Sequence, residues 1–382
     1  MDFESLFDIP IDDLHTPCYL TDARLLQKNT ALLKQIQQQT GCKILLAQKA
    51  FSMFSAYPLI RDDLAGTTAS GLFEAKLGRE HFGKEVHVFS PAYTQEDFTQ
   101  LLELCDHIVF NSFGQWKKYR QQVQDATRNI SCGIRINPGY AEVETDLYNP
   151  CISGSRMGVP LEQMEDDFAG LDGIHFHTMC EQNSDVLERT LDHMLPQFDK
   201  WLKRCKWVNF GGGHHITRPD YDVERLVRCI ERVRDTYGVQ VYLEPGEAVA
   251  LNAGYLVATV LDVVHNGMDI AILDASAACH MPDVLEMPYR PHILYSGTAG
   301  EKAYTYRLAG NTCLAGDVIG DYSFDHQLQS GEKLVFCDMA IYSMVKNNTF
   351  NGVPLPDIAL YQNGHIDLVK RFGYADFEGR LS

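Results

Sequence analysis

Residues that could do chemistry follow short apolar runs along the first two thirds of this chain. Lys49 ends one such run, 43–49, which is typical of a buried parallel strand. A lysine amine loses its proton when it is desolvated, and it can then attack a carbonyl group to form a Schiff base. Because most lysines are solvated surface groups, Lys49 becomes a functional candidate only together with the residues at other strand ends.

Three further strand ends carry complementary groups. Period-two alternation places His175 and His177 on the same strand face. We expect His175 to be a satisfied core residue, and His177, nearer the carboxyl end, to contact a ligand. The triplet Gly211–Gly213 would expose backbone N–H groups to a phosphate. Glu244, at the end of its run, could keep the nitrogen of a heteroaromatic ring protonated.

Together these groups predict a site for pyridoxal 5′-phosphate: a Schiff-base lysine, a stacking ring, a phosphate cradle and a buried carboxylate. Four such features at separate strand ends are much less probable by accident than any one of them. Glu247, three residues beyond Glu244, is equally compatible with a ligand contact and with a turn or a helix cap.

The elements that would position these groups alternate between apolar runs and amphipathic segments with helical period. The predicted strands are 43–49, 64–70, 85–90, 107–112, 130–137, 173–178, 207–211 and 239–244, and the predicted helices include 23–39, 72–82, 94–104, 114–126, 184–205 and 220–237. Eight strands that alternate with helices predict an α/β fold, a (β/α)8 TIM barrel over residues 22–250. A doubly wound open sheet is the alternative, but it would need a Gly-x-Gly-x-x-Gly turn near its start, which the sequence lacks.

The pattern changes after about residue 251. Strand-like runs at 255–264, 269–274, 302–308, 333–338 and 366–370 are separated by Gly, Pro and Asn turns. We therefore predict a C-terminal, mostly antiparallel β-domain over residues 251–382. Residues 1–21 contain a strand-like run at 16–21, which could join either domain.

Composition excludes several classes of protein. The formal net charge of −18 argues against a nucleic-acid partner and is compatible with a cationic small substrate. Eleven cysteines, none spaced as Cys-x-x-Cys, predict reduced thiols and no metal site. The acidic N-terminus lacks the features of a signal peptide, and no apolar stretch reaches membrane-spanning length. We expect a cytoplasmic protein without a membrane partner.

On these residues the chain resembles the fold type III, or alanine-racemase-like, pyridoxal phosphate enzymes, and within them the ornithine and diaminopimelate decarboxylases. The resemblance covers nearly the whole length. It implies that Lys49 is the Schiff-base lysine, that His177 stacks on the cofactor, that Gly211–Gly213 bind its phosphate, and that Glu244 contacts the pyridine nitrogen.

The resemblance extends into the predicted β-domain. The run Gly310-Asn311-Thr312-Cys313 looks like the motif whose cysteine reaches the site of a neighbouring subunit, which implies a homodimer with shared active sites. Tyr342 looks like the family tyrosine near the cofactor phosphate. From the residues alone, both Cys313 and Tyr342 would be expected to have buried structural roles.

Two departures from the general family pattern bear on the substrate. Many relatives carry arginine at the position of Glu247, and they often carry a glycine-serine pair where this chain has Met179-Cys180. These departures, with the stretches 146–151, 155–158 and 280–288, look like the branch that decarboxylates carboxynorspermidine and carboxyspermidine.

The charge of the predicted site agrees with this branch. An acidic Glu247 suits the ammonium groups of a carboxylated polyamine better than it suits a distal carboxylate. Asp283 is predicted as a further anionic substrate contact, and for Glu286 a solvated loop position is favoured. In the implied reaction, Lys49 holds the cofactor and Cys313 of a second subunit donates the proton that replaces carbon dioxide.

Several rival functions share parts of this pattern. A diaminopimelate-type or other basic amino acid decarboxylase would use the same scaffold, and a racemase would keep the carboxylate attached. A non-catalytic pyridoxal phosphate carrier would not need the β-domain or Cys313. A sugar-processing barrel with Glu244 and Glu247 as paired carboxylates would bind no cofactor.

Overall fold

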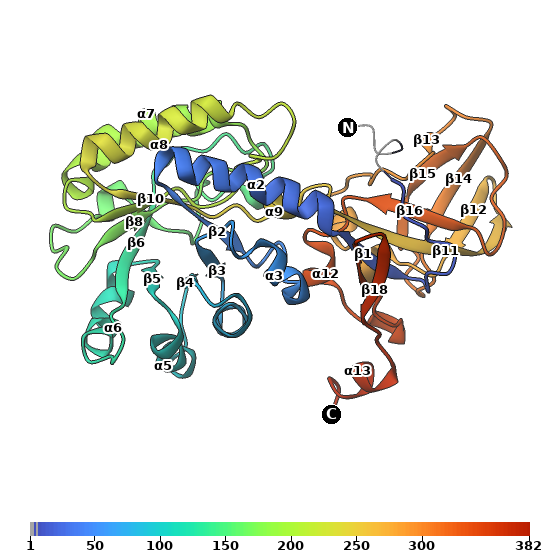
Figure 1. Ribbon diagram of the computed structural model, residues 1–382, viewed down its shortest axis with the longest axis horizontal. Coiled ribbons are helices and arrows are strands. Elements are labelled where there is room, and N and C mark those ends of the chain that lie inside the picture. The colour runs from blue at the N-terminus through green and yellow to red at the C-terminus, as the bar shows by residue number, and fades with distance from the viewer. Residues whose placement is uncertain (1–3, 5–6) are drawn as a thin grey trace. The chain divides into compact units, whose positions relative to one another are not determined.

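The structure is a computed structural model that describes residue 4 and residues 7–382. It divides into two compact units, one of Gln27–Val249 and one of Met1–Leu26 with Ala250–Ser382 (Figure 1). Of the N-terminal residues predicted to join either domain, 1–3 and 5–6 lie outside the described residues.

The first unit is a closed parallel barrel, which confirms the predicted fold class. Each strand pairs in parallel with its two neighbours, and pairing of β5 with β6 closes the ring, so the open-sheet alternative is excluded. The barrel strands are β2 Lys43–Ala47, β3 Gly66–Ala69, β4 Glu85–Phe89, β5 His107–Phe110, β6 Ser131–Asn137, β8 Gly173–His175, β9 Trp207–Asn209 and β10 Gln240–Leu243, and the short β7 Val159–Pro160 pairs with β6.

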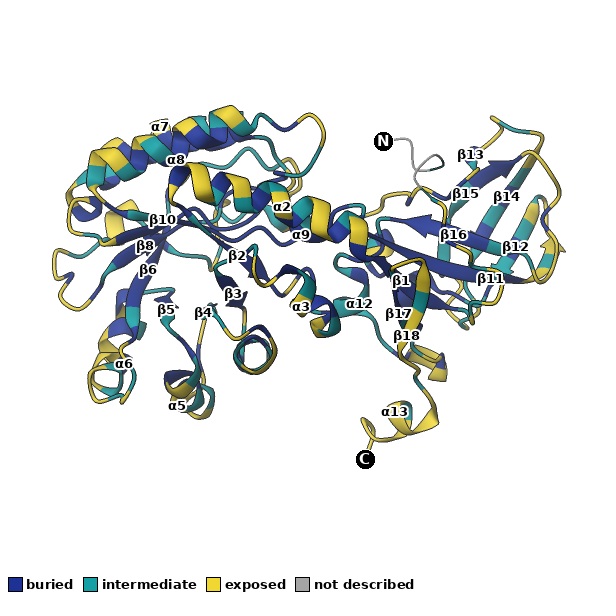
Figure 2. Cartoon of the chain, viewed as in Figure 1, coloured by how far each residue is buried: buried dark blue, intermediate teal, exposed yellow. Residues whose placement is uncertain are grey.

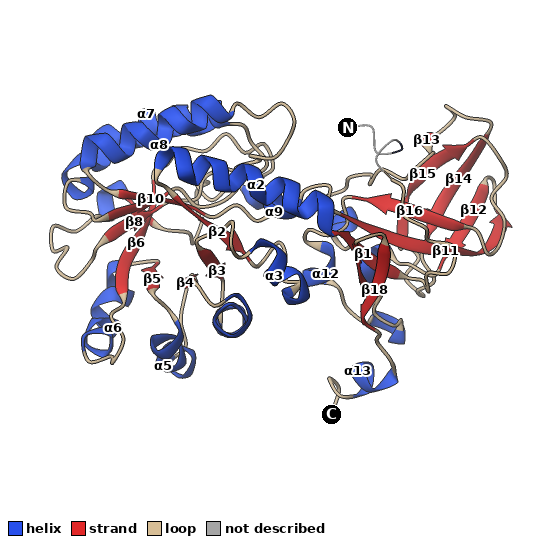
Figure 3. Ribbon diagram, viewed as in Figure 1, coloured by secondary structure: helices blue, strands red, loops and turns tan. Residues whose placement is uncertain are grey.

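Helices cover the outside of this barrel, as Figure 3 shows. Thr94 caps the helix α5, Gln95–Leu104, because its hydroxyl accepts a hydrogen bond from the Asp97 N–H at 3.1 Å. Figure 2 shows the helix α7, Ser184–Leu202, with alternating buried and exposed residues, whereas the barrel strands are mainly buried. The helices of this unit are α2 Ala23–Thr40, which begins in the other unit, α3 Tyr57–Ile60, α4 Leu72–Leu77, α5 Gln95–Leu104, α6 Phe113–Gln124, α7 Ser184–Leu202, α8 Val223–Tyr237 and α9 Glu247–Ala250.

Trp207 fills the inside of the barrel. Its indole passes over Gly133 and Gly173, where an added Cβ atom would lie 2.3 and 2.0 Å from the ring. The indole N–H donates a hydrogen bond to the Ser131 hydroxyl at 2.8 Å. The interior is therefore a packed core, and reactive groups are available only near the strand ends.

The second unit is a mostly antiparallel sheet domain. The run predicted near the N-terminus forms β1, which pairs with β11 and β17. The strands β13 Gly297–Thr298, β15 Val318–Phe324 and β17 Asp357–Gln362 were not predicted. The elements are β1 Cys18–Asp22, β11 Gly254–His265, β12 Asp269–Leu273, α10 Ala277–His280, α11 Asp283–Glu286, β13 Gly297–Thr298, β14 Tyr304–Ala309, β15 Val318–Phe324, β16 Lys333–Cys337, α12 Ser343–Lys346, β17 Asp357–Gln362, β18 His365–Lys370 and α13 Tyr374–Glu378. Across the described parts of both units, none of the helices has the length and apolarity needed to cross a bilayer.

Candidate active site

Lys49 lies in the turn that follows β2, two residues beyond the end of the strand. Its side chain is exposed, and its amine makes no hydrogen bond or ion pair with any residue that the structure describes. The surrounding protein nevertheless removes much of the water around the amine. This desolvation, reinforced by the positive charge of Arg135, lowers the pKa of Lys49. The nearby carboxylates of Glu244 and Glu247 oppose that shift. The result is an accessible amine with an increased tendency to be neutral.

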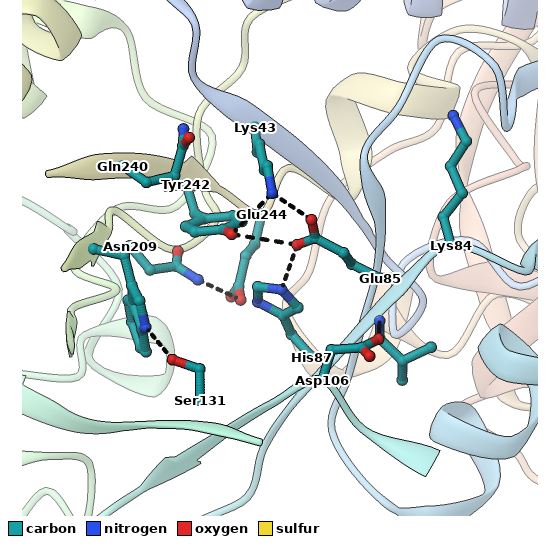
Figure 4. A network of polar contacts seen from close by, with 12 residues as sticks. Lys43, Lys84, Glu85, His87, Asp106, Ser131, Asn209, Gln240, Tyr242 and Glu244 are labelled. Atoms are coloured by element: carbon teal, nitrogen blue, oxygen red, sulfur yellow. Dashed lines mark hydrogen bonds and ion pairs between the residues drawn. The ribbon is translucent and has the colours of Figure 1, made fainter. Parts of the chain in front are cut away.

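Glu244 is held by two side chains from neighbouring strands. His175 in β8 and Asn209 in β9 are partners in the parallel register, so their side chains lie side by side. His175 Nε2 lies 3.1 Å from one carboxylate oxygen. Asn209 Nδ2 donates to the other at 2.8 Å, as Figure 4 shows. Burial alone would raise the pKa of Glu244, but His175 and Asn209 lower it to about 2. Glu244 is therefore ionised at neutral pH.

The role expected for His175 was incomplete. The side chain is buried, as predicted, but its Nε2 contacts Glu244, and its Nδ1 has no partner among the described residues. It is thus a support for the carboxylate as well as a core residue. The presence of His175 in an apolar strand was a signal for this contact in the sequence, because a buried imidazole at a strand end needs a polar partner.

His177 follows the end of β8 and has a fixed orientation. Its Nδ1 accepts a hydrogen bond from the Gly212 N–H at 3.0 Å, which places the ring proton on Nε2. Burial, together with the charges of Lys49 and Arg135, lowers the pKa of His177 well below its usual value. The ring is therefore a neutral, oriented surface, which suits stacking on an aromatic ligand.

The glycine loop after β9 is shaped by contact with the loop after β8. An added Cβ at Gly211 would lie 2.6 Å from His177 Cβ, and one at Gly213 would lie 1.9 Å from the Met179 carbonyl oxygen. Both glycines also have positive φ values, +69° and +82°. The N–H groups of Gly211 and Gly212 bond to Asn209 and His177. Among the described residues, the Gly213 N–H has no hydrogen-bond partner, unlike the N–H groups of Gly211 and Gly212. It is therefore the N–H group of this loop that is available to an anion.

Two charged residues that the sequence analysis left without a role also face this region. Arg135 is buried; it stacks over the Phe89 ring at 4.6 Å and donates to the His177 carbonyl oxygen at 3.3 Å. Glu74, in α4, accepts the Ser70 N–H at 2.6 Å, and burial raises its pKa although Lys49 opposes the shift. Arg135 braces the loop that carries His177, and Glu74 adds a carboxyl group near the lysine.

A second polar network lies at the opposite ends of the barrel strands. Lys43, Glu85 and His107 are the first residues of β2, β4 and β5. Glu85, His87 and His107 are a combination that could hold a metal ion. The Lys43 ammonium already pairs with Glu85, which also contacts Tyr242 at 3.3 Å (Figure 4). The cluster thus contains its own cation, and we assign it a structural role.

The predicted residues of the β-domain belong to loops that hydrogen bonds tie together. Buried Asp317 accepts from the hydroxyls of Ser276 and Thr312 at 2.8 and 2.6 Å, which connects α10 to the loop that carries Cys313. The Cys313 N–H donates to Asn351 at 2.8 Å, and the thiol side chain is exposed. Cys313 is therefore not the buried structural cysteine that its residue type alone suggested.

Tyr342 and Asp283 lie at the two short helices of this unit. Tyr342 caps α12 in the left-handed conformation, with φ of 54°, which is uncommon for an aromatic residue. Asp283 begins α11 and forms an ion pair with Lys346, the last residue of α12. Lys346 also pairs with Glu286 at 2.6 Å, so the structure gives Glu286 a partner as well.

The barrel residues fit pyridoxal 5′-phosphate. The lysine amine is unbonded among the described residues, the glutamate is ionised and fixed, the histidine ring is neutral, and one N–H of the glycine loop has no partner. Lys49, His177, Gly213 and Glu244 would hold the group, and Gly211 and Gly212 would shape its surroundings. Asn209 was missed in the sequence, although it lies two residues from Trp207 and so shares the inward face of β9.

Comparison with known proteins gives one family match. Residues 18–340 match the family model described as pyridoxal-dependent decarboxylase, C-terminal sheet domain. A carboxynorspermidine/carboxyspermidine decarboxylase of Campylobacter jejuni is 42% identical, with 97% of this chain and 99% of that protein covered. A carboxyaminopropylagmatine decarboxylase of Synechocystis is 41% identical, with 97% and 96% covered.

A solved structure agrees with these relatives. The crystal structure of carboxynorspermidine decarboxylase from Campylobacter jejuni, complexed with norspermidine, has a TM-score of 0.89 and 40% identity, and the match covers 96% of this chain and 100% of that one.

Proposed function

Because this chain belongs to the pyridoxal-dependent decarboxylase family, we propose that it removes the carboxylate of carboxynorspermidine, carboxyspermidine or both, to give norspermidine and spermidine. The family match confirms the predicted resemblance, the carboxy-lyase class and the pyridoxal phosphate cofactor. The observation that carries the substrate proposal is the nearly full-length similarity to an enzyme with this activity.

A second candidate substrate is carboxyaminopropylagmatine. The relative named for it is almost as similar to this chain, at 41% identity, as the carboxynorspermidine enzyme is at 42%. The two kinds of substrate differ at the far end, where a guanidinium replaces an ammonium. A guanidinium is recognised best by a bidentate carboxylate, whereas an ammonium needs only a point of negative charge.

The barrel residues would supply cofactor binding and electronic control. Lys49 would attach the cofactor through its amine, and its lowered pKa favours the neutral, nucleophilic form. Glu244 would keep a proton on the ring nitrogen, because its carboxylate stays ionised and oriented by two donors. When bound, the cofactor supplies an electron sink for the pair released as carbon dioxide leaves. His177 would hold the ring in place.

The β-domain residues would complete the reaction. Cys313 would donate a proton to the substrate Cα in place of the lost carboxylate, and the resulting thiolate would regain a proton from solvent. Its exposed thiol is compatible with reaching the site of a second subunit in a homodimer. Tyr342 would contact the cofactor phosphate, and Glu247 and Asp283 would attract the ammonium groups of the substrate.

A decarboxylation assay tests the proposed substrate. Carbon dioxide release should be fastest with the two carboxylated triamines, slower with carboxyaminopropylagmatine, and near background with diaminopimelate, ornithine and arginine. Preference for carboxyaminopropylagmatine would transfer the assignment to the second candidate. Turnover of diaminopimelate alone would refute both, and a bound cofactor without turnover of any of these acids would favour a carrier.

Mixing two inactive variants tests the shared active site. If Lys49 and Cys313 act from different subunits, Lys49→Ala mixed with Cys313→Ala should form hybrid dimers with one intact site. About half of the dimers would be hybrids with half of their sites intact, so about a quarter of the wild-type activity should return. A monomer, or a dimer with separate sites, would recover none.

A cytoplasmic location without a nucleic-acid or membrane partner remains a prediction. All eleven cysteines are free in the structure, which supports a reducing compartment. Tagged protein that appeared in a secreted or membrane fraction would contradict it.

A further inference from the structure

We infer that Lys346 is a built-in competitor for the substrate: its ammonium occupies the acidic cradle of Asp283 and Glu286 until an ammonium of the polyamine displaces it. The inference rests on the proposed function, because it deepens the role given to Asp283. It adds Glu286 and Lys346 to the residues that determine specificity.

The cradle is built to hold a primary ammonium. Asp283 and Glu286 lie at the two ends of α11, one helical turn apart, so both carboxylates face the same side. Lys346 Nζ bridges them: it pairs with Asp283 and lies 2.6 Å from a Glu286 carboxylate oxygen. A lysine ammonium and the terminal ammonium of a triamine have the same charge and the same donors. The cradle therefore already holds the group that the substrate would present.

The bridge is open to exchange. The Lys346, Asp283 and Glu286 side chains are 32%, 22% and 54% exposed. Ion pairs with this much solvent contribute little net stability, so a competing cation can replace one partner at low cost. With Lys346 in place, two carboxylates and one ammonium leave a single net negative charge. Displacement of Lys346 offers both carboxylates to the incoming cation.

Lys346 also lies on the same short helix as Tyr342, the residue proposed to contact the cofactor phosphate. It ends α12, the four-residue helix that Tyr342 caps. Two residues later, Asn348 bonds to the backbone of Ala278 and Cys279 in α10, which keeps the end of α12 beside the segment that leads to α11. The lysine thus stays close to the cradle when it is displaced, which makes the exchange reversible.

Removing the competitor and removing the cradle should have opposite effects. In the full-length protein loaded with pyridoxal phosphate, Lys346→Met should bind norspermidine roughly threefold to tenfold more tightly, and the gain should shrink in high salt. The double variant Asp283→Asn, Glu286→Gln should bind it more weakly by a similar factor. The measurement is titration calorimetry with norspermidine itself.

A matched control is Lys302→Met, which removes a lysine from an ion pair with Asp325 in the same unit. It makes the same change in net charge and should leave norspermidine binding unchanged. If Lys346 merely braces α11, Lys346→Met will weaken binding in the same direction as the double variant, and the inference fails. If the wild-type enzyme decarboxylates neither triamine acid, the proposed function fails instead, whatever the sign of the Lys346→Met effect.

Discussion

The barrel and the β-domain build their parts of the proposed site in different ways. In the barrel, His175 in β8, Asn209 in β9 and Glu244, which directly follows β10, lie at the ends of three adjacent parallel strands. The strand register places His175 beside Asn209, and both side chains contact Glu244. In the β-domain, Cys313 and Asp283 lie on a loop and on a four-residue helix, held by bonds from side chains distant in the sequence.

This difference suggests a division of labour. Strand ends provide rigid positions, which suits cofactor chemistry that tolerates little displacement. Loops and short helices can exchange partners, which suits recognition of a flexible, charged substrate. Substitutions in the barrel should therefore change the chemistry and the cofactor spectrum, whereas substitutions around α11 of the β-domain should change substrate affinity. Cys313, the proposed proton donor, is the β-domain residue whose substitution should change the chemistry.

The largest expected effect comes from Lys49→Ala. Activity should fall by roughly a thousandfold or more, because the only proposed covalent anchor of the cofactor is lost. Borohydride reduction followed by mass spectrometry should find no cofactor attached to the protein. Lys43→Ala, at the start of the strand that Lys49 follows, is the control and should still be labelled. Labelling at another lysine in the Lys49 variant would refute the central assignment.

Glu244→Gln should have the next largest effect. The amide cannot hold a proton on the ring nitrogen, so kcat should fall by about a hundredfold while norspermidine binding stays within about twofold. Because the pKa of Glu244 is about 2, this carboxylate should not contribute to the pH profile near neutrality. A variant with normal kcat would show that Glu244 is a structural residue only.

Asp283→Asn tests the other side of the comparison. We expect KM for the triamine acid to rise by about fivefold with little change in kcat, because one attractive charge is lost from substrate binding. Asp325→Asn removes an equivalent charge elsewhere in the β-domain and should leave KM unchanged. A selective fall in kcat would contradict the proposed division between the two units.

The smallest expected effect concerns stability in acid. Burial, together with neighbouring His87, lowers the pKa of His107 from 6.5 to about 2, although Glu85 opposes the shift. Between these values the unfolded chain binds a proton that the folded barrel does not, so the free energy of unfolding falls as the pH falls below 6.5. The slope from this residue is at most about 1.4 kcal/mol per pH unit.

Urea denaturation at about pH 7 and about pH 5.5 would measure this slope, and His107→Gln should reduce it. An unchanged slope in the variant would mean that His107 is protonated in the folded barrel, with Glu85 as the stronger influence.

The sequence predicted the barrel well because its signals are local. Each strand is an apolar run, and Lys49, His177 and Glu244 follow such runs directly. The two residues that hold Glu244 in place, His175 and Asn209, were harder to recognise. They lie side by side because of the register between β8 and β9, and this register cannot be read from the sequence of either strand alone.

The β-domain was harder to predict for two physical reasons. The strand β15 contains Gly320 and Asp321, which in a single sequence favour a turn. The partner of Asp283 is Lys346, more than sixty residues later, and no local pattern connects them. The proposed roles of Cys313 and Tyr342 rest on the family resemblance alone, because residue type by itself predicts buried structural positions.

The interlocked loops after β8 and β9 have a consequence for how this enzyme can evolve. Even one methyl group at Gly211 or Gly213 would collide with the neighbouring loop, so that wall cannot be reshaped by small mutational steps. A change of substrate would therefore require substitutions at positions where neighbouring residues can rearrange, such as those around α11. The loops that would bind the vitamin B6 cofactor would stay the same.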